Sequence, residues 1–370
     1  MFVQNFLTQK TKNIIFLLLI LLLIASNLAT LLSWRIHETM HNMISQTVSF
    51  FSTELAKKVL LADSLAEFPN PIFSSANLQN GPMFFEAWIG ALSYTLQLYF
   101  DFSGYSDMAI GLSLMFNVRL PMNFNSPYKA SSIIDFWRRW HITLSHFLRD
   151  YLYIPLGGSR NGKVRRYINL LITMLLGGLW HGAGWTFVIW GGLHGFYLVI
   201  NHFWRGFRLK IGLTRRSTLG KFFATLLTFL TVVIAWVFFR ADSYSSAISI
   251  ISGMLSLNGI SISEPLWNVL QTSHPDWLNG VIMNGLAPLS RINPDRALIL
   301  IAVGLLIVFL LPNTQQLLYR FNPVLDEEHE LKVPRWQWRF NPLFAWVLGF
   351  IFVISLTFLS RVRDFLYFQF

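Results

Sequence analysis

Long uncharged apolar runs alternate with short basic blocks along the chain, and this pattern predicts membrane-spanning helices. The clearest run, residues 13–33, carries no charged side chain and exceeds the roughly 20 residues needed to cross the hydrocarbon core. An uncleaved signal anchor would show the same pattern. Three further runs predict spanning helices at 222–239, 297–311 and 342–359, and two weaker runs beside acidic residues lie at 83–100 and 107–116.

One apolar run, residues 167–201, is too long for a single crossing. It contains no Asp, Glu, Lys or Arg, and one helix of that length would measure about 50 Å against a bilayer core of about 30 Å. Basic blocks flank the run on both sides, and if both stay in the cytoplasm the segment must enter and return. We therefore predict a helical hairpin or re-entrant pair that bends at Gly182 and Gly184, with His181 next to the bend.

Residues 117–166 have a different character, because aromatic residues recur there every three or four positions among basic ones. This spacing predicts an amphipathic helix at the membrane surface or along a cavity wall. Two polar segments, 259–293 and 326–339, are predicted to be exposed loops. The residues that define the amphipathic helix are Phe136, Trp137, Trp140, Leu144, Phe147 and Leu148, with Arg138, Arg139, His141 and Arg149 among them.

Composition supports a membrane protein. Of the 370 residues, 54% are hydrophobic and 13% are charged, about half the charge of a soluble domain. This excludes a soluble multidomain enzyme, a disordered chain and a disulfide scaffold. The absence of cysteine also excludes Cys-ligated zinc and a cysteine acyl-enzyme. The net charge of +11 lies in short blocks between apolar runs, which indicates cytoplasmic anchors against anionic lipid and no nucleic acid partner.

Histidines inside an uncharged segment are candidates for chemistry, because a polar group at membrane depth is costly unless it faces a cavity or a partner. His181 is the best candidate, since a neutral imidazole accepts a proton near pH 7. A histidine hydrogen-bonded between packed helices is the structural alternative. His194 lies thirteen positions later and would point to a different face of a continuous helix.

For the other polar candidates, the residues alone favour the structural alternative. His141 follows an Arg-Arg-Trp sequence, and an interfacial belt of aromatic and basic residues explains it as well. For Asp101 and Asp107 the favoured reading is that they cap and pair helices near an interface. Asp135 is expected at a helix start or in a salt bridge. The sequence shows no nucleotide-binding loop, metal-ligand spacing or serine triad motif.

Four stretches resemble, in order, signatures of the membrane-bound O-acyltransferase family. They are 94–111, 135–145, 147–158 and 178–182, which hold Asp101, Asp107, His141 and His181. Together with 236–241 and 365–370 they resemble the branch of the bacterial alginate O-acetylases. Teichoic acid D-alanyl transferases and peptidoglycan O-acetyltransferases are similar. The resemblance runs from about residue 50 to the end of the chain.

The resemblance implies an all-α polytopic membrane protein, with a helical bundle around a central chamber and re-entrant or amphipathic helices. We expect an N-terminal transmembrane anchor at 1–49, where family members usually carry several helices, and a catalytic membrane domain at 50–370. The family's essential Trp-His-Gly histidine corresponds to His181, and its second site histidine corresponds to His141. The substrate-binding candidates are Asp101, Asp107, Arg138, Arg139, Trp180 and His194, the last with its role open.

The implied function is transfer of an acetyl group from cytoplasmic acetyl-CoA toward hydroxyls of an exported polysaccharide, alginate-like or peptidoglycan. A periplasmic acetyltransferase partner would complete the transfer, or the sugar would receive the acetyl group from this chain. The acetyl group would leave its donor by direct transfer or by way of a histidine-borne acyl group. Arg138 and Arg139 would hold the donor's phosphates, although anchoring to lipid headgroups explains them too. We expect no bound cofactor or metal and a multi-pass location in the bacterial inner membrane. The alternative is a non-catalytic or truncated membrane component that conducts an acyl group or glycan to a partner transferase.

Overall fold

The computed structural model describes residues 38–76, 81–212, 217–262, 286–288, 292–321, 323–325 and 342–359. The helix predicted at 13–33 and the loop at 326–339 lie outside these residues, as does most of the loop at 259–293. The described residues are predominantly helical, which confirms the predicted helical class. The strands among them are β1 (Ile260–Ile262) and β2 (Leu286–Pro288), three residues each, which pair in parallel.

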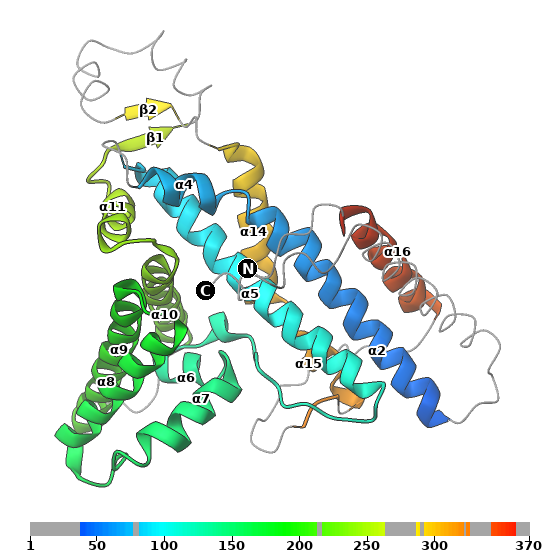
Figure 1. Cartoon of the computed structure of the whole chain (residues 1–370), viewed down its shortest axis with the longest axis horizontal. Coiled ribbons are helices and arrows are strands. Elements are labelled where there is room, and N and C mark those ends of the chain that lie inside the picture. Colours follow the sequence, from blue (N-terminus) through cyan, green and yellow to red (C-terminus); the bar gives the residue numbers. More distant parts are fainter. Residues whose placement is uncertain are drawn as a thin grey trace.

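A 31-residue helix, α5 (Phe84–Leu114), runs through the middle of the molecule (Figure 1). Helix α2 (Glu38–Ala56) packs along it, and α16 (Pro342–Phe358) packs on the side of α2 that faces away from α5. Helices α4 (Pro69–Ser75) and α14 (Pro294–Leu310) also pack on α5. Most of the side chains of α5 are therefore buried against protein.

The prediction of two separate weak spans at 83–100 and 107–116 was wrong, because α5 continues through the acidic residues between them. Helix α2 leads into a π-helical turn, η1 (Lys57–Ala62), whose first two residues are lysines. Lys58 Nζ lies 2.5 Å from Asp101 Oδ1, and Lys57 Nζ lies 3.3 Å from Asp107 Oδ2. Paired carboxylates can be buried in an apolar bundle where isolated ones cannot.

The predicted hairpin is confirmed. Helices α8 (Gly162–His181) and α9 (Trp185–Lys210) lie side by side and are joined by three residues that include Gly182 and Gly184 (Figure 1). Glycines stand where the two backbones approach most closely. A Cβ built on Gly178 would lie 2.3 Å from the carbonyl oxygen of Phe187, and one on Gly191 would lie 2.2 Å from that of Met174.

This close approach predicts that Gly191→Ala destabilises the hairpin. The new methyl group meets backbone atoms that cannot rotate away, so α8 and α9 must separate at a cost of about 1–3 kcal/mol. Gly206→Ala is the matched control, since it lies on the same helix with nothing within 4 Å of a Cβ. Thermal unfolding in detergent should show a lower midpoint for Gly191→Ala alone; equal midpoints for the two variants would contradict the prediction.

The single amphipathic helix predicted around Trp137 was also wrong. The structure has two short helices, α6 (Ile133–Trp137) and α7 (Ile142–Leu148), followed by the π-helical turn η3 (Arg149–Tyr153). The helix is interrupted at His141, whose φ of 42° and ψ of 58° belong to the left-handed region. The expected apolar residues are buried on both sides of the break, except Phe147, which is exposed.

Helix α10 (Thr218–Arg240) contains the predicted span 222–239 and is, of the described helices, the one long and apolar enough to cross a membrane. It packs on both α5 and α9. Helix α11 (Tyr244–Met254) follows it. The predicted segments 297–311 and 342–359 form α14 and α16. The remaining short elements are α3 (Asp63–Leu65), η2 (Pro127–Lys129), α15 (Thr314–Leu317) and η4 (Tyr319–Phe321).

Candidate active site

His181 is the last residue of α8, and aromatic rings surround its imidazole. The ring centroid lies 5.0 Å from that of Trp180, 5.1 Å from that of Trp190 on α9 and 5.1 Å from that of Phe239 on α10, all in edge-to-face geometry. The side chain is half-buried. An imidazole in this setting is shielded from bulk water but still reachable, which suits a group that accepts a proton from a substrate.

Gly182 explains why His181 ends its helix next to the bend, as predicted. A Cβ on Gly182 would lie 2.6 Å from Cε2 of Phe187, so any side chain at this position would have to displace the Phe187 ring. Phe187 in turn packs edge-on against Phe239, with ring centroids 5.1 Å apart. The missing side chain thus lets the first turn of α9 fold against the end of α8.

His141 lies in the connection between α6 and α7, forty positions before His181 in the sequence. Packed aromatic rings connect the two histidines. The ring of Trp140, next to His141, lies 5.0 Å from that of Trp236, which stacks at 5.7 Å on Trp190, the neighbour of His181. The His141 ring packs edge-on against Phe102 of α5 at 4.8 Å, and its Nδ1 lies 3.3 Å from Oδ1 of Asn123. The chain therefore brings both predicted catalytic histidines into one region, between α5 and the α8–α9 hairpin.

The surroundings of His141 favour its neutral form. Burial lowers the pKa of its imidazole below the ordinary value, and repulsion from a charged His181 lowers this pKa further. A group with a lowered pKa loses its proton at a lower pH, so the ring is neutral around pH 7. A neutral imidazole has one nitrogen that accepts a hydrogen bond or a proton.

His194, the third predicted histidine, is completely buried one layer behind His181. Its Nδ1 accepts a hydrogen bond of 3.2 Å from the indole Nε1 of Trp137, and its ring stacks on Phe136 at 6.0 Å. Trp190 lies between the two histidines, 5.0 Å from His194 and 5.1 Å from His181. Through these contacts His194 links α6 to α9 and packs against Trp190.

Asp101 is held in an ion-pair cluster. The ammonium of Lys58 lies 2.9 Å from Oδ1 of Asp63 and 2.5 Å from Oδ1 of Asp101, and all three side chains are buried. The structure therefore joins Asp101 to η1 and α3. This is the helix-pairing contact that the sequence offered as an alternative to substrate binding.

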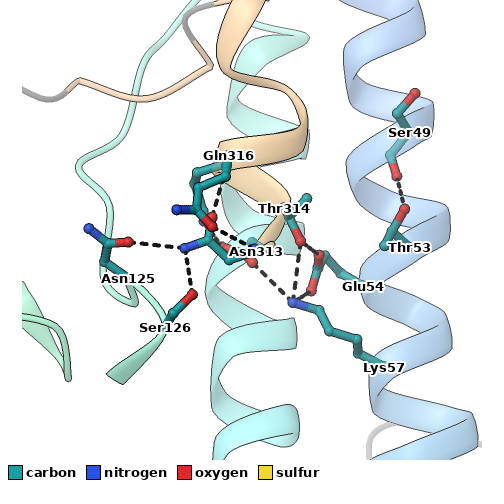
Figure 2. A network of polar contacts seen from close by, with 11 residues as sticks. Ser49, Thr53, Glu54, Lys57, Asn125, Ser126, Asn313, Thr314 and Gln316 are labelled. Carbon is teal, nitrogen blue, oxygen red and sulfur yellow. Dashed lines mark hydrogen bonds and ion pairs between the residues drawn. The ribbon is translucent and has the colours of Figure 1, made fainter. Parts of the chain in front are cut away.

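Asp107 belongs to a second polar network, which joins α2, η1, α5 and α15. Its carboxylate pairs with Lys57 and accepts a hydrogen bond from the amide of Gln315. Lys57 also pairs with Glu54 and lies 3.4 Å from the hydroxyl of Thr314, which donates to Glu54 (Figure 2). The contacts of Asp107, like those of Asp101, tie helices together.

The remaining predicted binding residues differ in exposure. Arg138 is exposed in the α6–α7 connection. Arg139 is partly buried, with Nε 2.8 Å from Asp135 Oδ1 and Nη1 donating to the carbonyl of Asn125 at 3.2 Å. Asp135 thus stands in a salt bridge in the first turn of α6, as predicted. Trp180 is 57% exposed beside His181, so its indole is available to a bound molecule.

Sequence reasoning missed several residues that shape this region. Asn123 and Phe102 contact His141, and Trp190 contacts His181, but none of the three stands out in a pattern of charge or periodicity. Lys57 and Lys58 are adjacent lysines that run directly into an apolar stretch. That signal would have indicated buried ion-pair partners for the two aspartates of α5. Within the described residues, no group of three or more His, Asp or Glu side chains is arranged to hold a metal ion.

Comparison with known proteins identifies related chains. The family model described as MBOAT, membrane-bound O-acyltransferase family, matches residues 4–239. A peptidoglycan O-acetyltransferase of Helicobacter pylori is 52% identical over 212 residues, which are 57% of this chain and 39% of that protein. A probable alginate O-acetylase of Pseudomonas aeruginosa is 48% identical over 214 residues, 58% of this chain and 39% of that protein.

More distant similarity extends to another acyl transfer. A teichoic acid D-alanyltransferase of Streptococcus thermophilus is 30% identical over 171 residues, 44% of this chain and 41% of that protein. The matched regions of these curated relatives thus amount to about two fifths of their length.

Proposed function

The chain belongs to the membrane-bound O-acyltransferase family, and from this premise we propose that it is an enzyme that transfers an acetyl group to hydroxyls of an exported polysaccharide. The names of its relatives support this activity, since one is called a peptidoglycan O-acetyltransferase and another a probable alginate O-acetylase. The acceptor would be alginate-like or peptidoglycan. The acetyl group reaches it directly or through a periplasmic transferase partner.

The observation that carries the proposal is the meeting of His141 and His181 in surroundings that are largely aromatic. The two residues come from motifs forty positions apart, and the packed rings of Trp140, Trp236 and Trp190 connect them. A histidine that serves packing alone is expected to be fully buried and hydrogen-bonded, as His194 is. Two neighbouring imidazoles, both only partly buried, are instead suited to moving a proton at a reacting atom.

In the proposed reaction His181 takes the proton of the attacking hydroxyl while the hydroxyl oxygen bonds to the thioester carbonyl carbon. The carbon–sulfur bond then breaks, and the proton passes from His181 to the departing thiolate. The products are an ester and a free thiol, and the histidine returns to its neutral form. No acyl-cysteine can form on this chain, because it contains no cysteine.

Acetyl-CoA on the cytoplasmic side is the donor in this proposal. Arg138 is exposed near the histidines and offers a positive charge to the donor's phosphates. Arg139 is held by Asp135 and orients this turn. The exposed indole of Trp180 offers an apolar face beside His181. We place the whole protein in the bacterial inner membrane, as a multi-pass helical bundle around a central chamber.

The proposal is tested by measuring polymer-bound acetate in a bacterial strain that lacks its own O-acetylase of this family and is complemented with this chain. Restored acetate is the expected result, and it should rise with the amount of protein in the membrane. An acetate-free polymer despite membrane-inserted protein would overturn the proposal and favour a non-catalytic component that conducts an acyl group or glycan.

A further inference from the structure

Asn123 places its side-chain oxygen against one ring nitrogen of His141. Its Oδ1 lies 3.2 Å from the backbone nitrogen of Thr143, 2.7 Å from the Thr143 hydroxyl and 3.3 Å from Nδ1 of His141. A backbone N–H is always a donor, so the side-chain atom that faces Thr143 must be the amide oxygen. The same oxygen faces His141, and an oxygen without a proton can only accept. A hydrogen bond between these two atoms therefore requires the proton to be on Nδ1 of His141.

The backbone on both sides of this contact is tied together. The amide of Asn125 donates to the carbonyl of Arg139 at 2.9 Å, and the amide of Ile142 donates to the carbonyl of Asn123 at 3.1 Å. The guanidinium of Arg139 adds a hydrogen bond to the carbonyl of Asn125. Residues 123–125 and 139–143 thus form a small frame around His141, and Asn123 cannot move independently of the turn it contacts.

The backbone is strained at His141, within the frame, and at Ser126, directly after it, which supports a functional role for this turn. His141 and Ser126 both adopt the left-handed backbone conformation, with φ of 42° and 48°. For residues other than glycine this costs about 1–3 kcal/mol and persists where the surroundings enforce it, often at active sites. The surroundings include Asn313, which donates to Asn125 and Ser126 at 3.1 Å each and joins the frame to α15 (Figure 2).

We propose that Asn123 is a positioning residue that holds His141 as the Nδ1–H tautomer, so that Nε2 is an acceptor during acyl transfer. This role rests on the proposed function. In this tautomer the neutral ring takes a hydrogen bond or a proton at Nε2 but cannot donate from it. The group opposite His141 must then be a donor, either the hydroxyl of the acceptor sugar or an N–H of His181.

The tautomer is measured directly by ¹⁵N solid-state NMR of the full chain, labelled at histidine and reconstituted in lipid. The His141 signals are identified by their absence from the His141→Gln spectrum. We expect a protonated Nδ1 and an unprotonated Nε2 in the wild type, and a loss of this preference in Asn123→Ala. A wild-type His141 protonated on Nε2 would overturn the proposal.

Kinetics separate positioning from simple support of the turn. Asn123→Ala should lower kcat by about 10- to 100-fold with little change in KM, because the ring loses its orientation while the binding groups remain. Asn123→Asp keeps an acceptor at the same place and should restore much of kcat. Its carboxylate stabilises the protonated ring and raises the pKa of His141, so the acid limb of the pH–rate profile should move to higher pH. Among the described residues, the titratable group that acts on His141 is His181.

Thr143→Val is the matched structural control, because it removes one hydrogen bond to the same oxygen and leaves the contact with His141. We expect it to keep the Nδ1–H tautomer. An equal loss of tautomer preference and of kcat in Thr143→Val and Asn123→Ala would assign Asn123 to supporting α7 and overturn the proposal. An inactive wild-type chain with the expected tautomer would count against the proposed function, whereas the opposite tautomer in an active chain would count against Asn123 alone.

Discussion

Replacing His181 with alanine is expected to lower acetyl transfer by about 10²–10⁴-fold, the range typical for loss of a general base. The imidazole is half-buried at the end of α8, and its neighbours are the rings of Trp180, Trp190 and Phe239. Its removal should therefore leave insertion and folding largely intact while nothing takes the hydroxyl proton. The measurement is the initial rate of ester formation on the polymer, normalised to folded protein in the membrane.

His202→Ala provides the control for this variant. His202 lies on the neighbouring helix α9 and is partly buried, so the same chemical change is made outside the aromatic surroundings of His181. We expect its rate to stay near that of the wild type. A His181→Ala protein that keeps most of its activity, or a His202→Ala protein that loses as much, would remove His181 from the proposed reaction.

The largest expected effect on stability is that of Lys58→Met. The ammonium of Lys58 is buried between Asp63 and Asp101, and methionine fills a similar volume without the charge. The two carboxylates would then lose the ammonium that pairs with both of them. Breaking a buried pair from one side costs about 3–5 kcal/mol. The measurement is the free energy of unfolding in detergent, and a second measurement on Lys58→Met with Asp101→Asn should recover part of the loss.

Arg149→Met is the matched control for the buried pair. Arg149 pairs with Asp150 at 2.7 Å, but the two side chains are 47% and 43% exposed. An exposed pair is worth about 0–1 kcal/mol, so this variant should unfold almost like the wild type. Equal stability of Lys58→Met and Arg149→Met would show that the cluster around Lys58 does not hold α5 against η1.

Features that depend on nearby residues were predictable from the chain. The hairpin follows from a run too long for one crossing and from the glycines at 182 and 184, which the structure places between α8 and α9. The apolar run 222–239 predicted α10 for the same reason. The position of His181 beside the bend needed no tertiary contact, because helix length and backbone freedom are local properties.

Features that depend on distant contacts were not predictable. The aspartates of α5 suggested two interrupted spans, but α5 is continuous through them, and lysines more than forty positions earlier pair with their buried carboxylates. The periodicity around Trp137 suggested one helix, since apolar spacing does not reveal a left-handed residue at 141. Ion pairs with distant lysines allow the aspartates of α5 to be buried. The hydrogen-bonded frame around His141 holds the left-handed residue that ends the helix there.

The chain by itself determined a helical, strongly apolar protein, its hairpin and the two histidines worth testing. Only the tertiary structure decided which polar groups meet: His141 with Asn123, Asp101 with Lys58, and Asp107 with Lys57. The physical reason is one of range. Helix propensity and hydrophobic spacing act over a few residues. Compensation of a buried charge, or the choice of a histidine tautomer, instead requires a partner that the fold brings from elsewhere in the chain.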